Sequence, residues 1–335
     1  MKNKKLNLAV VAGGDSGEYE ISIRSAAVVI ENLNHQTYNK FLIHIKGSSW
    51  TFINQNNEEC QVDKTDFSIV VNNEKIKFDC VFIVIHGTPG EDGKLQGYFD
   101  MLHLPYTSCG SITSALTFNK SFCNKVVAAF GVNTAPSVHL FRHTLIDAEA
   151  ILETVGLPCF VKPNCGGSSV GMTKVKETSG LLPAIEKAFV EDQEVLIEAF
   201  VKGREITCGV FRHEKQIVTL PIVEIVSKKE FFDFEAKYNP ELAEELLPAP
   251  IPEAIDKQCK EISSMLYDKL GCKGVVRFDY LFNDTNINFL EVNTVPGLSA
   301  ESIVPKMARF AGFTMSGFYD VLIREALSQA NRQLF

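Results

Sequence analysis

The chain of 335 residues lacks a long hydrophobic run, an excess of basic residues and any CxxC pair. No window approaches the roughly 20 apolar residues needed to span a bilayer. The net charge of −8 argues against a surface for nucleic acid or anionic membrane, which needs a basic footprint, so any phosphate site must be local. A hydrophobic content of 45% and a charged content of 22% indicate an ordinary globular protein with a substantial core and two or three domains.

The nine cysteines are odd in number and spread from Cys60 to Cys272. We therefore expect reduced, mostly buried thiols in a cytoplasmic protein, without a zinc site. The basic residues 1–5 run into a short apolar stretch that ends at Gly13-Gly14 rather than at a cleavage site. This pattern favours a buried strand over a signal peptide. The sequence contains no internal repeat and no low-complexity segment.

Apolar patterns in the first third of the chain indicate an α/β fold. Strand-like runs occupy residues 6–11, 41–45 and 81–85, and helical spacing covers residues 22–33. Glu18 follows the first run and His86 the third. Because ligand sites of open α/β sheets lie beyond the carboxyl ends of strands, both are candidates for one edge, although each alone is more often a loop or capping residue. Gly13-Gly14 without a full GxGxxG is weak evidence for a dinucleotide.

A glycine-rich segment, residues 164–171 (NCGGSSVG), follows a strand-like run at 159–163. Its backbone N–H groups and hydroxyls could wrap phosphate oxygens, with Lys162 supplying positive charge. The GKS/T ending of a Walker loop is absent. From these residues alone, a phosphate loop and a glycine-rich hairpin without a ligand are equally open. The flanking pattern predicts helices over 111–130, interrupted near Asn119-Lys120, and 147–155, and a strand over 138–141.

The second half is predicted to contain strands over 195–200, 206–211 and 218–225 and helices over 252–270 and 314–329. Glu198, beside an aromatic residue on the first of these strands, could help to hold an adenine amino group and a ribose hydroxyl. Any surface strand would look similar. Residues 226–250 lack sustained periodicity, and a segment of that length in a compact domain is usually a functional lid or disordered. Its aromatic residues favour a lid.

Two β-rich runs, residues 275–282 and 287–292, are joined by the turn-like residues 283–286 and predict a hairpin. Residues two apart on a strand share a face, so Arg277 and Asp279 point one way, as do Glu291 and Asn293. If the faces meet, two carboxylates and an amide oxygen form a hard-oxygen set suited to Mg²⁺. The alternative is an exposed hairpin with scattered polar residues, which explains poorly why they interrupt such an apolar run.

Five motifs follow one another along the chain: GGxSxExE at residues 13–20, HGxxGEDGxxQG at 86–97, KPxxxGSSxG at 162–171, EAKY at 235–238 and RxD…ExNxxPG at 277–297. Together they resemble the D-alanine–D-alanine ligases of the ATP-grasp superfamily. They cover nearly the whole chain in the family's order. Phe278, Tyr280 and Phe289 are aromatic where the family commonly has aliphatic residues, and Gly166 fills a variable position. These departures should affect strand packing rather than chemistry.

The resemblance implies an α/β, ATP-grasp fold with an amino-terminal Rossmann-like parallel-sheet domain. The implied domains are residues 1–110 on the substrate side, 111–200 with the glycine-rich loop, and 201–335 with the lid (226–250) and the metal site. It also implies a homodimer formed through the amino-terminal domain.

The resemblance further implies that ATP binds between two domains that close on it. The implied nucleotide-binding residues are Lys120, Lys162, Ser168, Ser169, Glu198, Phe200, Val201, Glu205 and Lys237. Two Mg²⁺ ions, or Mn²⁺ in their place, would bind Asp279, Glu291 and Asn293, with Glu291 bridging them.

In the implied reaction, the carboxylate of a first D-alanine attacks the γ-phosphate, and the amine of a second D-alanine attacks the resulting acyl phosphate. The dipeptide would serve peptidoglycan precursor synthesis.

Alternatives are a ligase that uses D-lactate or D-serine, another ATP-grasp carboxylate–amine ligase, or a non-catalytic nucleotide-binding protein. The resemblance also implies roles for single residues. Arg277 and the N–H of Gly297 would hold the oxyanion, and Glu18 and His86 would hold the first ammonium group. Ser302 and Ile303 would receive the second carboxylate, and Glu18, Ser168 and Tyr238 would form a network that completes the closed lid.

Overall fold

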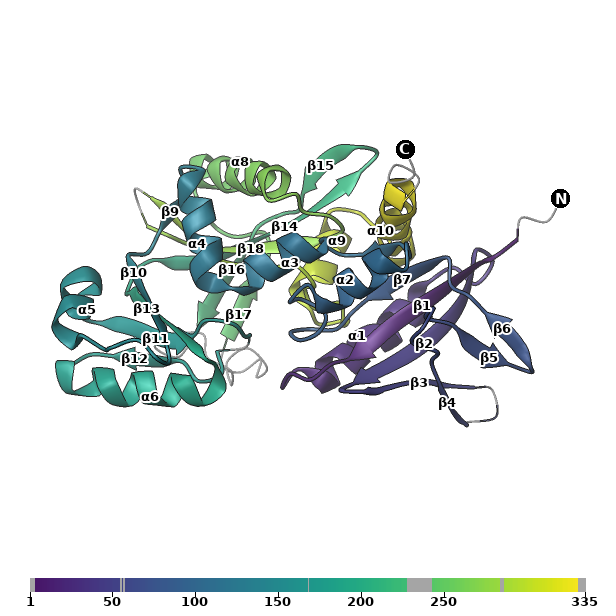
Figure 1. Ribbon diagram of the computed structural model, residues 1–335. Coiled ribbons are helices and arrows are strands. Elements are labelled where there is room, and N and C mark those ends of the chain that lie inside the picture. Colours follow the sequence, from purple (N-terminus) through teal and green to yellow (C-terminus); the bar gives the residue numbers. More distant parts are fainter. Residues whose placement is uncertain are drawn as a thin grey trace.

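The computed structural model describes residues 4–54, 56, 58–167, 169–227, 243–283 and 286–330. Within these ranges, three main sheets lie side by side with helices packed against them (Figure 1). The predicted α/β organisation is therefore present in the structure.

The first sheet, at the right of Figure 1, has the strand order β4-β3-β2-β1-β7-β8. β1 pairs in parallel with both β2 and β7, as expected for a Rossmann-like sheet, and residues 8–12 of β1 are fully buried. A continuous apolar run suits a parallel strand that is covered on both faces. The elements are β1 (Leu6–Gly13), α1 (Tyr19–Asn32), β2 (Tyr38–Lys46), β3 (Ser49–Ile53), β4 (Glu59–Gln61), the separate hairpin β5 (Ile69–Val71) and β6 (Glu74–Ile76), β7 (Cys80–Ile83), α2 (Lys94–Met101) and β8 (Tyr106–Thr107).

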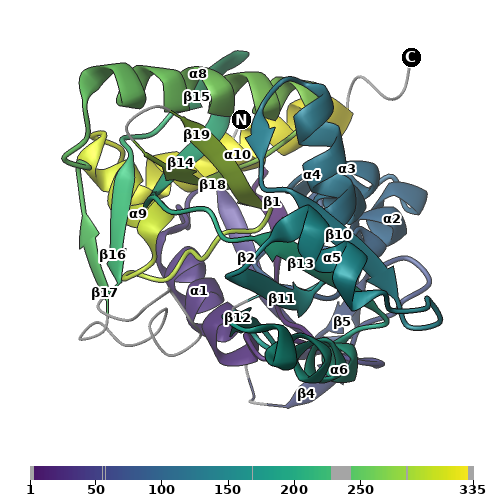
Figure 2. The same ribbon diagram turned by 90° about the vertical axis from the view of Figure 1, so that its left-hand side faces the viewer.

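The second sheet is antiparallel, in the order β10-β13-β11-β12. It faces the viewer in Figure 2 together with its two helices, α5 and α6, which share its hydrophobic core. The strand β11 leads directly into the glycine-rich loop. The elements are β10 (Ser137–Phe141), α5 (Ala148–Val155), β11 (Cys159–Pro163), β12 (Thr173–Val175), a 3-10 turn (Thr178–Gly180), α6 (Leu181–Glu191) and β13 (Glu194–Ala199).

The third sheet has the order β17-β16-β14-β18-β19-β9, and β15 pairs with β14. The helix α8 packs on β14, and α3 and α4 contact β19. The predicted hairpin is confirmed as the antiparallel pair β18 and β19. The elements are α3 (Ser111–Phe118), α4 (Lys120–Ala129), β9 (Asn133–Thr134), β14 (Arg204–His213), β15 (Gln216–Thr219), β16 (Val223–Ser227), β17 (Ala243–Leu246), α8 (Glu253–Lys269), β18 (Val276–Phe282), β19 (Ile287–Asn293), α9 (Ile303–Phe310) and α10 (Met315–Ala330).

Three expectations about elements need correction. The single strand predicted over 218–225 is two strands, because Pro221 lacks the N–H that a ladder needs. The N–H of Leu220 still bonds the carbonyl of Gly209 (2.8 Å) in the register of β15, whereas β16 pairs with β14 one residue out of that register. The helix predicted from residue 22 begins at Tyr19. The stretch predicted to lack structure, 226–250, contains β17, which pairs with β16. Residues 228–242 of that stretch lie outside the described residues.

The carboxyl-terminal helices join the first and third sheets into one core. Phe82 of β7 meets Tyr319 of α10 with ring centroids 5.7 Å apart, and Phe318 of α10 meets Phe211 of β14 at 5.1 Å. Both helices α9 and α10 belong to the same buried cluster as β1. This shared core fixes the carboxyl end of β1 beside the β18–β19 hairpin. The domain boundaries at residues 110 and 200 stay predictions.

Candidate functional site

Two adjoining cavities lie where the three sheets meet. The larger, of about 810 Å³, is lined by the first and third sheets and the smaller, of about 410 Å³, by the second and third. Lys120, Gly166, Glu205 and Glu291 line both. Predicted residues on the larger cavity are Glu18, His86, Lys120, Glu205, Arg277, Asp279, Glu291, Asn293, Gly297, Ser302 and Ile303. Those on the smaller are Lys120, Lys162, Ser169, Glu198, Phe200, Val201, Glu205 and Glu291.

The hairpin presents its four polar residues on one face, as the alternation predicts. Arg277 is opposite Asn293, and Asp279 is opposite Glu291. The register then shifts between Asp279 and the next residue, Tyr280. A bulge at that point interrupts the pairing immediately beyond the polar face, and the pairing resumes in a shifted register with Tyr280 opposite Phe289.

Arg277 and Asp279 form a bidentate ion pair, which the sequence reasoning missed. Arg277 Nε and Nη2 donate to the two oxygens of Asp279 at 2.8 and 2.7 Å. The same carboxylate accepts from Thr207 Oγ1 (2.5 Å) and Asn293 Nδ2 (3.1 Å). Burial alone would lower the pKa of the Arg277 guanidinium, but the carboxylates of Asp279, Glu291 and Glu205 raise it. The arginine therefore stays charged, and within the part of the chain that the structure describes Asp279 takes two of its five N–H donors, which leaves three for other partners.

The donor set on this face fits Mg²⁺. Asp279 is 3% exposed, Glu291 and Asn293 are partly buried, and all three line the larger cavity. Each oxygen of Asp279 already accepts two hydrogen bonds, one of them from Arg277 and the other from Thr207 or Asn293, so a metal ion here would have to replace one of these bonds. Within the described ranges, no three His, Cys, Asp or Glu side chains gather as a metal cluster. A metal ion at this face would therefore also need the amide oxygen of Asn293, a ligand type that hard cations accept.

Two lysines line the cavities, Lys120 both of them and Lys162 the smaller one. Lys120 Nζ donates to the carbonyl of Gly166 (2.6 Å) and lies 3.7 Å from Glu291 Oε2. Lys162 pairs with Glu198, whose other oxygen accepts from Asn124 Nδ2 (2.6 Å). Both ammonium groups are therefore held in place beside the glycine-rich loop, where they can offer charge to phosphate oxygens.

Apolar side chains of Phe160, Met172 and Phe200 line the smaller cavity. Lys174 Nζ lies 3.9 Å from the ring centroid of Phe200. An apolar wall with Glu198 and Glu205 on the same cavity is suited to a heteroaromatic ring and an attached sugar.

On the substrate side, the 86–93 loop is tied to the loop after β19. His86 Nδ1 lies 2.7 Å from the carbonyl oxygen of Val295, and Glu91 accepts from the N–H of Val295 (3.1 Å) and of Gly87 (2.7 Å). Burial lowers the pKa of His86, whereas desolvation and the charge of Glu18 raise that of Glu91 to about 7. Among the described residues, His86 Nε2 has no partner, although it is buried. An unsatisfied nitrogen on a cavity wall is available to a ligand.

Two glycines of this cavity let the backbone approach polar side chains closely. A Cβ at Gly167 would lie 2.9 Å from Glu18 Oε2, and one at Gly297 would lie 2.7 Å from Ser302 Oγ. Ser302 immediately precedes α9, and Ile303 is its first residue. The first N–H groups of a helix have no partner within the helix and favour an anion, so this end of the cavity suits a carboxylate.

Three predicted residues, Ser168, Lys237 and Tyr238, lie outside the described residues. Conversely, the structure adds Glu91 and Thr207 to the site. Glu91 stands within the 86–97 motif, which could have drawn attention to it. Thr207 sits opposite Asp279 on the neighbouring strand β14, and no local sequence signal announces that pairing.

Family models and named relatives match this protein along nearly its whole length. The family model described as D-ala D-ala ligase N-terminus matches residues 7–109, and that described as D-ala D-ala ligase C-terminus matches residues 126–324. The D-alanine–D-alanine ligase of Phocaeicola vulgatus is 46% identical over 309 residues, covering 92% of this chain and 95% of that protein. The enzyme of the same name from Flavobacterium johnsoniae is 44% identical over 322 residues, covering 96% and 99%.

Solved structures give the same result. The VanG D-Ala:D-Ser ligase from Enterococcus faecalis is 33% identical with a TM-score of 0.84, covering 96% of this chain and all of that one. The D-alanine–D-alanine ligase from Bacillus anthracis complexed with ATP is 27% identical with a TM-score of 0.79, covering 98% and 99%. These neighbours confirm the predicted ATP-grasp fold. With both family models matched and relatives above 40% identity over nearly its whole length, the chain belongs to the D-alanine–D-alanine ligase family.

Proposed function

We infer that this protein joins two D-alanine molecules into D-alanyl-D-alanine, with hydrolysis of ATP to ADP, for peptidoglycan precursor synthesis. One observation carries the inference beyond family membership. The polar face of the β18–β19 hairpin, the two lysines beside the glycine-rich loop and the Glu18–His86 edge line two adjoining cavities. A carboxylate, a phosphate chain and an amine can therefore meet at one point.

ATP would occupy the smaller cavity with its phosphates directed toward the hairpin. Phe200 and Val201 would bound the adenine, Glu198 would hold its amino group, and Glu205 would bind the ribose. Lys120, Lys162, Ser168, Ser169 and Lys237 would address the phosphates. Asp279, Glu291 and Asn293 would hold two Mg²⁺ ions, or Mn²⁺, which would neutralise charge on the transferred phosphoryl group.

Each end of the larger cavity would hold one amino acid. Glu18 and His86 would bind the ammonium of the first D-alanine, and Ser302 with the N–H of Ile303 would receive the carboxylate of the second. The remaining N–H groups of Arg277 and the N–H of Gly297 would stabilise the oxyanion that forms when the second amine attacks the acyl phosphate. Glu18, Ser168 and Tyr238 would form the network that couples lid closure to substrate orientation.

Phosphate release tests this function directly. We expect purified protein with ATP and Mg²⁺ to release phosphate only when D-alanine is added, and mass spectrometry to identify D-alanyl-D-alanine. Equal release without D-alanine would overturn the ligase proposal.

D-Serine is a second candidate for the attacking substrate, because the VanG relative is described as a D-Ala:D-Ser ligase. A competition assay with D-alanine, D-serine and D-lactate together would separate the three products. If the main product contains D-serine or D-lactate, the assignment of D-alanine as second substrate is wrong, while the acyl-phosphate chemistry is unaffected.

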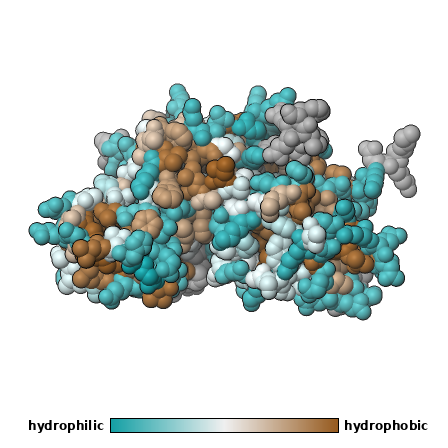
Figure 3. Space-filling view, viewed as in Figure 1, coloured by the Kyte–Doolittle hydropathy of each residue, from teal (hydrophilic) through white to brown (hydrophobic). Residues whose placement is uncertain are grey.

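We also propose a homodimer in the cytoplasm. The family resemblance implies a contact through the amino-terminal domain, where Met101 of α2 is 75% exposed. Apolar side chains continue over the adjoining face that carries α3 and α4 (Figure 3), where Ile112 is 84% exposed. All nine cysteines are free, which suits a reducing compartment. Within the described residues, no helix is long and apolar enough to cross a membrane. Sedimentation of wild type and of Ile112→Lys tests the dimer. We expect wild type to sediment as a dimer and the variant as a monomer, and a monomeric wild type would overturn the proposal.

A further inference from the structure

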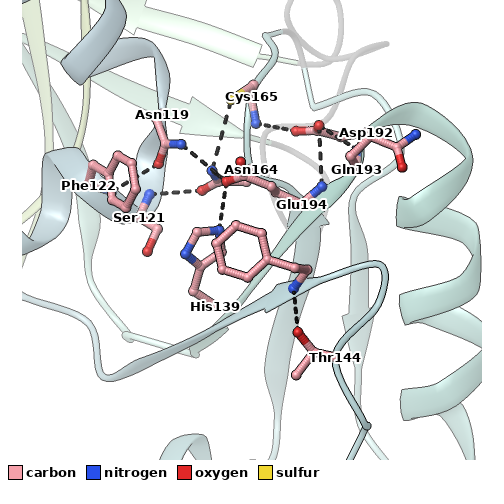
Figure 4. A network of polar contacts seen from close by, with 11 residues as sticks. Asn119, Ser121, Phe122, His139, Thr144, Asn164, Cys165, Asp192, Gln193 and Glu194 are labelled. Carbon is pink, nitrogen blue, oxygen red and sulfur yellow. Dashed lines mark hydrogen bonds and ion pairs between the residues drawn. The ribbon is translucent and has the colours of Figure 1, made fainter.

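A polar network lies at the root of the glycine-rich loop, where β11 ends (Figure 4). Its centre is the carboxylate of Glu194 at the start of β13. The donors to Glu194 Oε2 are the amides of Asn164 (2.8 Å) and Asn119 (3.2 Å) and His139 Nε2 (2.8 Å). These residues come from four separate segments of the chain, and none is among the predicted site residues.

Asn164 is the residue through which the network reaches the loop. It is fully buried, and both its backbone and its side chain are bonded. Its N–H donates to the carbonyl of Glu194 (2.9 Å), and its own carbonyl accepts from the N–H of Lys120 (3.1 Å). Its side-chain oxygen accepts from the N–H of Ser121 (2.9 Å). Asn164 thus joins β13 to the first turn of α4.

The same contacts fix Lys120 between two parts of the proposed ATP site. Its backbone is held by Asn164, while its ammonium contacts the loop carbonyl of Gly166 and lies near Glu291 of the hairpin. The helix that begins at Lys120, α4, also packs against β19, which bears Glu291. The separation of the glycine-rich loop from the hairpin therefore depends on how α4 is attached at its first turn.

We propose that Glu194 and Asn164 are positioning residues for ATP. They hold the loop root and Lys120 in one arrangement, so that loop N–H groups, the lysine ammonium and the hairpin carboxylates address the same phosphate chain. A second tie strengthens the root, because Asp192 accepts from the N–H of Cys165 (2.7 Å). This inference rests on the ATP site of the proposed function.

A fixed root matters because the loop itself cannot supply rigidity. Glycine residues lose more conformational freedom on ordering than others, so a glycine-rich loop binds phosphate well only if its ends are already placed. Loss of the Glu194 carboxylate would leave the buried amide of Asn164 without its acceptor. The expected consequence is a loop that must be reordered each time ATP binds.

Three variants and one control test the proposal. Glu194→Ala removes the shared acceptor, and Asn164→Asp keeps the oxygen for Ser121 but replaces the donor to Glu194 with a carboxylate. Asn119→Asp keeps the oxygen that caps α4 while losing the other amide donor. Gln193→Ala is the matched control, because its side chain accepts from Arg142 Nε (2.8 Å) and contacts neither Asn164 nor Lys120.

We expect Glu194→Ala and Asn164→Asp to raise KM for ATP by about tenfold, the order of one buried hydrogen bond to a charged group. Calorimetric affinity for ADP should fall by a similar factor, while KM for D-alanine stays within about twofold. Asn119→Asp should give a smaller rise, and the control should match wild type. A merely structural network would lower the melting temperature and leave the ratio of the two KM values unchanged.

The outcomes separate this inference from the proposed function. Unchanged KM for ATP and unchanged ADP affinity in the folded variants, with an active wild type, would overturn the positioning role alone. If Glu194→Ala does not fold, Asn119→Asp decides, since its helix cap is intact. A wild type without D-alanine-dependent phosphate release would overturn the proposed function, whereas ADP affinity would still report on the network.

Discussion

The polar face of the β18–β19 hairpin and the root of the glycine-rich loop both fix charged groups beside the same cavities, but they do so differently. On the hairpin, Arg277 and Asp279 are two residues apart and bond each other directly. At the root, Glu194 collects donors from segments up to 75 residues away in sequence. The first arrangement follows from strand alternation, whereas the second exists only once the sheets have assembled.

The two regions therefore have different roles, because the hairpin carries the groups proposed to react and the root holds other groups in position. The hairpin presents the groups that would touch metal and phosphate, and strand alternation and register place them on one face, to which β14 adds the hydrogen bond from Thr207 to Asp279. The root contains no group proposed to contact the reacting atoms. Changes on the hairpin should therefore affect turnover most, and changes at the root should affect nucleotide binding.

The largest effect is expected for Glu291→Gln. A neutral amide cannot balance two divalent cations, and loss of a few kcal/mol in the transition state lowers the rate by about a hundredfold or more. Circular dichroism should show an intact fold. Turnover near that of wild type at saturating Mg²⁺ would remove Glu291 from the metal site and with it the assignment of chemistry to the hairpin.

Asp279→Asn should combine a loss of activity with a loss of stability. It removes the charge that faces the partly buried Arg277, and breaking a buried ion pair by changing one partner costs about 3 kcal/mol. Urea unfolding of the variant measures that cost, with Glu291→Gln as the comparison on the same face. A free energy of unfolding equal to that of wild type would mean that Thr207 and Asn293, rather than the charge, hold the site together.

Glu91 offers a pH-dependent test of the link between the first and third sheets. Its pKa is raised from 4.5 to about 7 in the folded protein. Its contribution to stability is therefore fully present below pH 4.5 and is lost as the pH rises through 7. Between pH 5 and pH 8 we expect the melting temperature of Glu91→Gln, which stays neutral, to fall less than that of wild type.

His86 contributes with the opposite sign and is the control for that experiment. Its pKa is lowered from 6.5 by burial, so its contribution is present above pH 6.5 and is lost as the pH falls below that value. Both proteins contain His86, and the difference between their pH profiles isolates Glu91. Parallel profiles would show that Glu91 titrates normally.

The sequence predicted those parts of the fold and site that depend on local periodicity or on contiguous motifs. Strand alternation placed Arg277, Asp279, Glu291 and Asn293 on one face, and the apolar run of β1 indicated a buried strand. Contacts such as Thr207 with Asp279 could not be predicted, because they depend on which strands pair. Pro221 is a different case, because a residue without an N–H is visible in the sequence, yet the apolar run around it predicts one strand where the structure has two.

The smallest expected effect tests whether the root can be divided into a helix cap and a nucleotide-positioning network. Asn119 Oδ1 accepts from the N–H of Phe122 (3.0 Å), while Asn119 Nδ2 donates to Glu194. Asn119→Ala loses both, and loss of an N-cap costs about 1 kcal/mol. Asn119→Ser restores an N-cap acceptor but has no amide to donate to Glu194. We therefore expect urea unfolding to show recovered stability in Asn119→Ser, while its KM for ATP stays raised. Recovery of both together would show that Asn119 acts only by starting α4, and that the root influences ATP through helix stability alone.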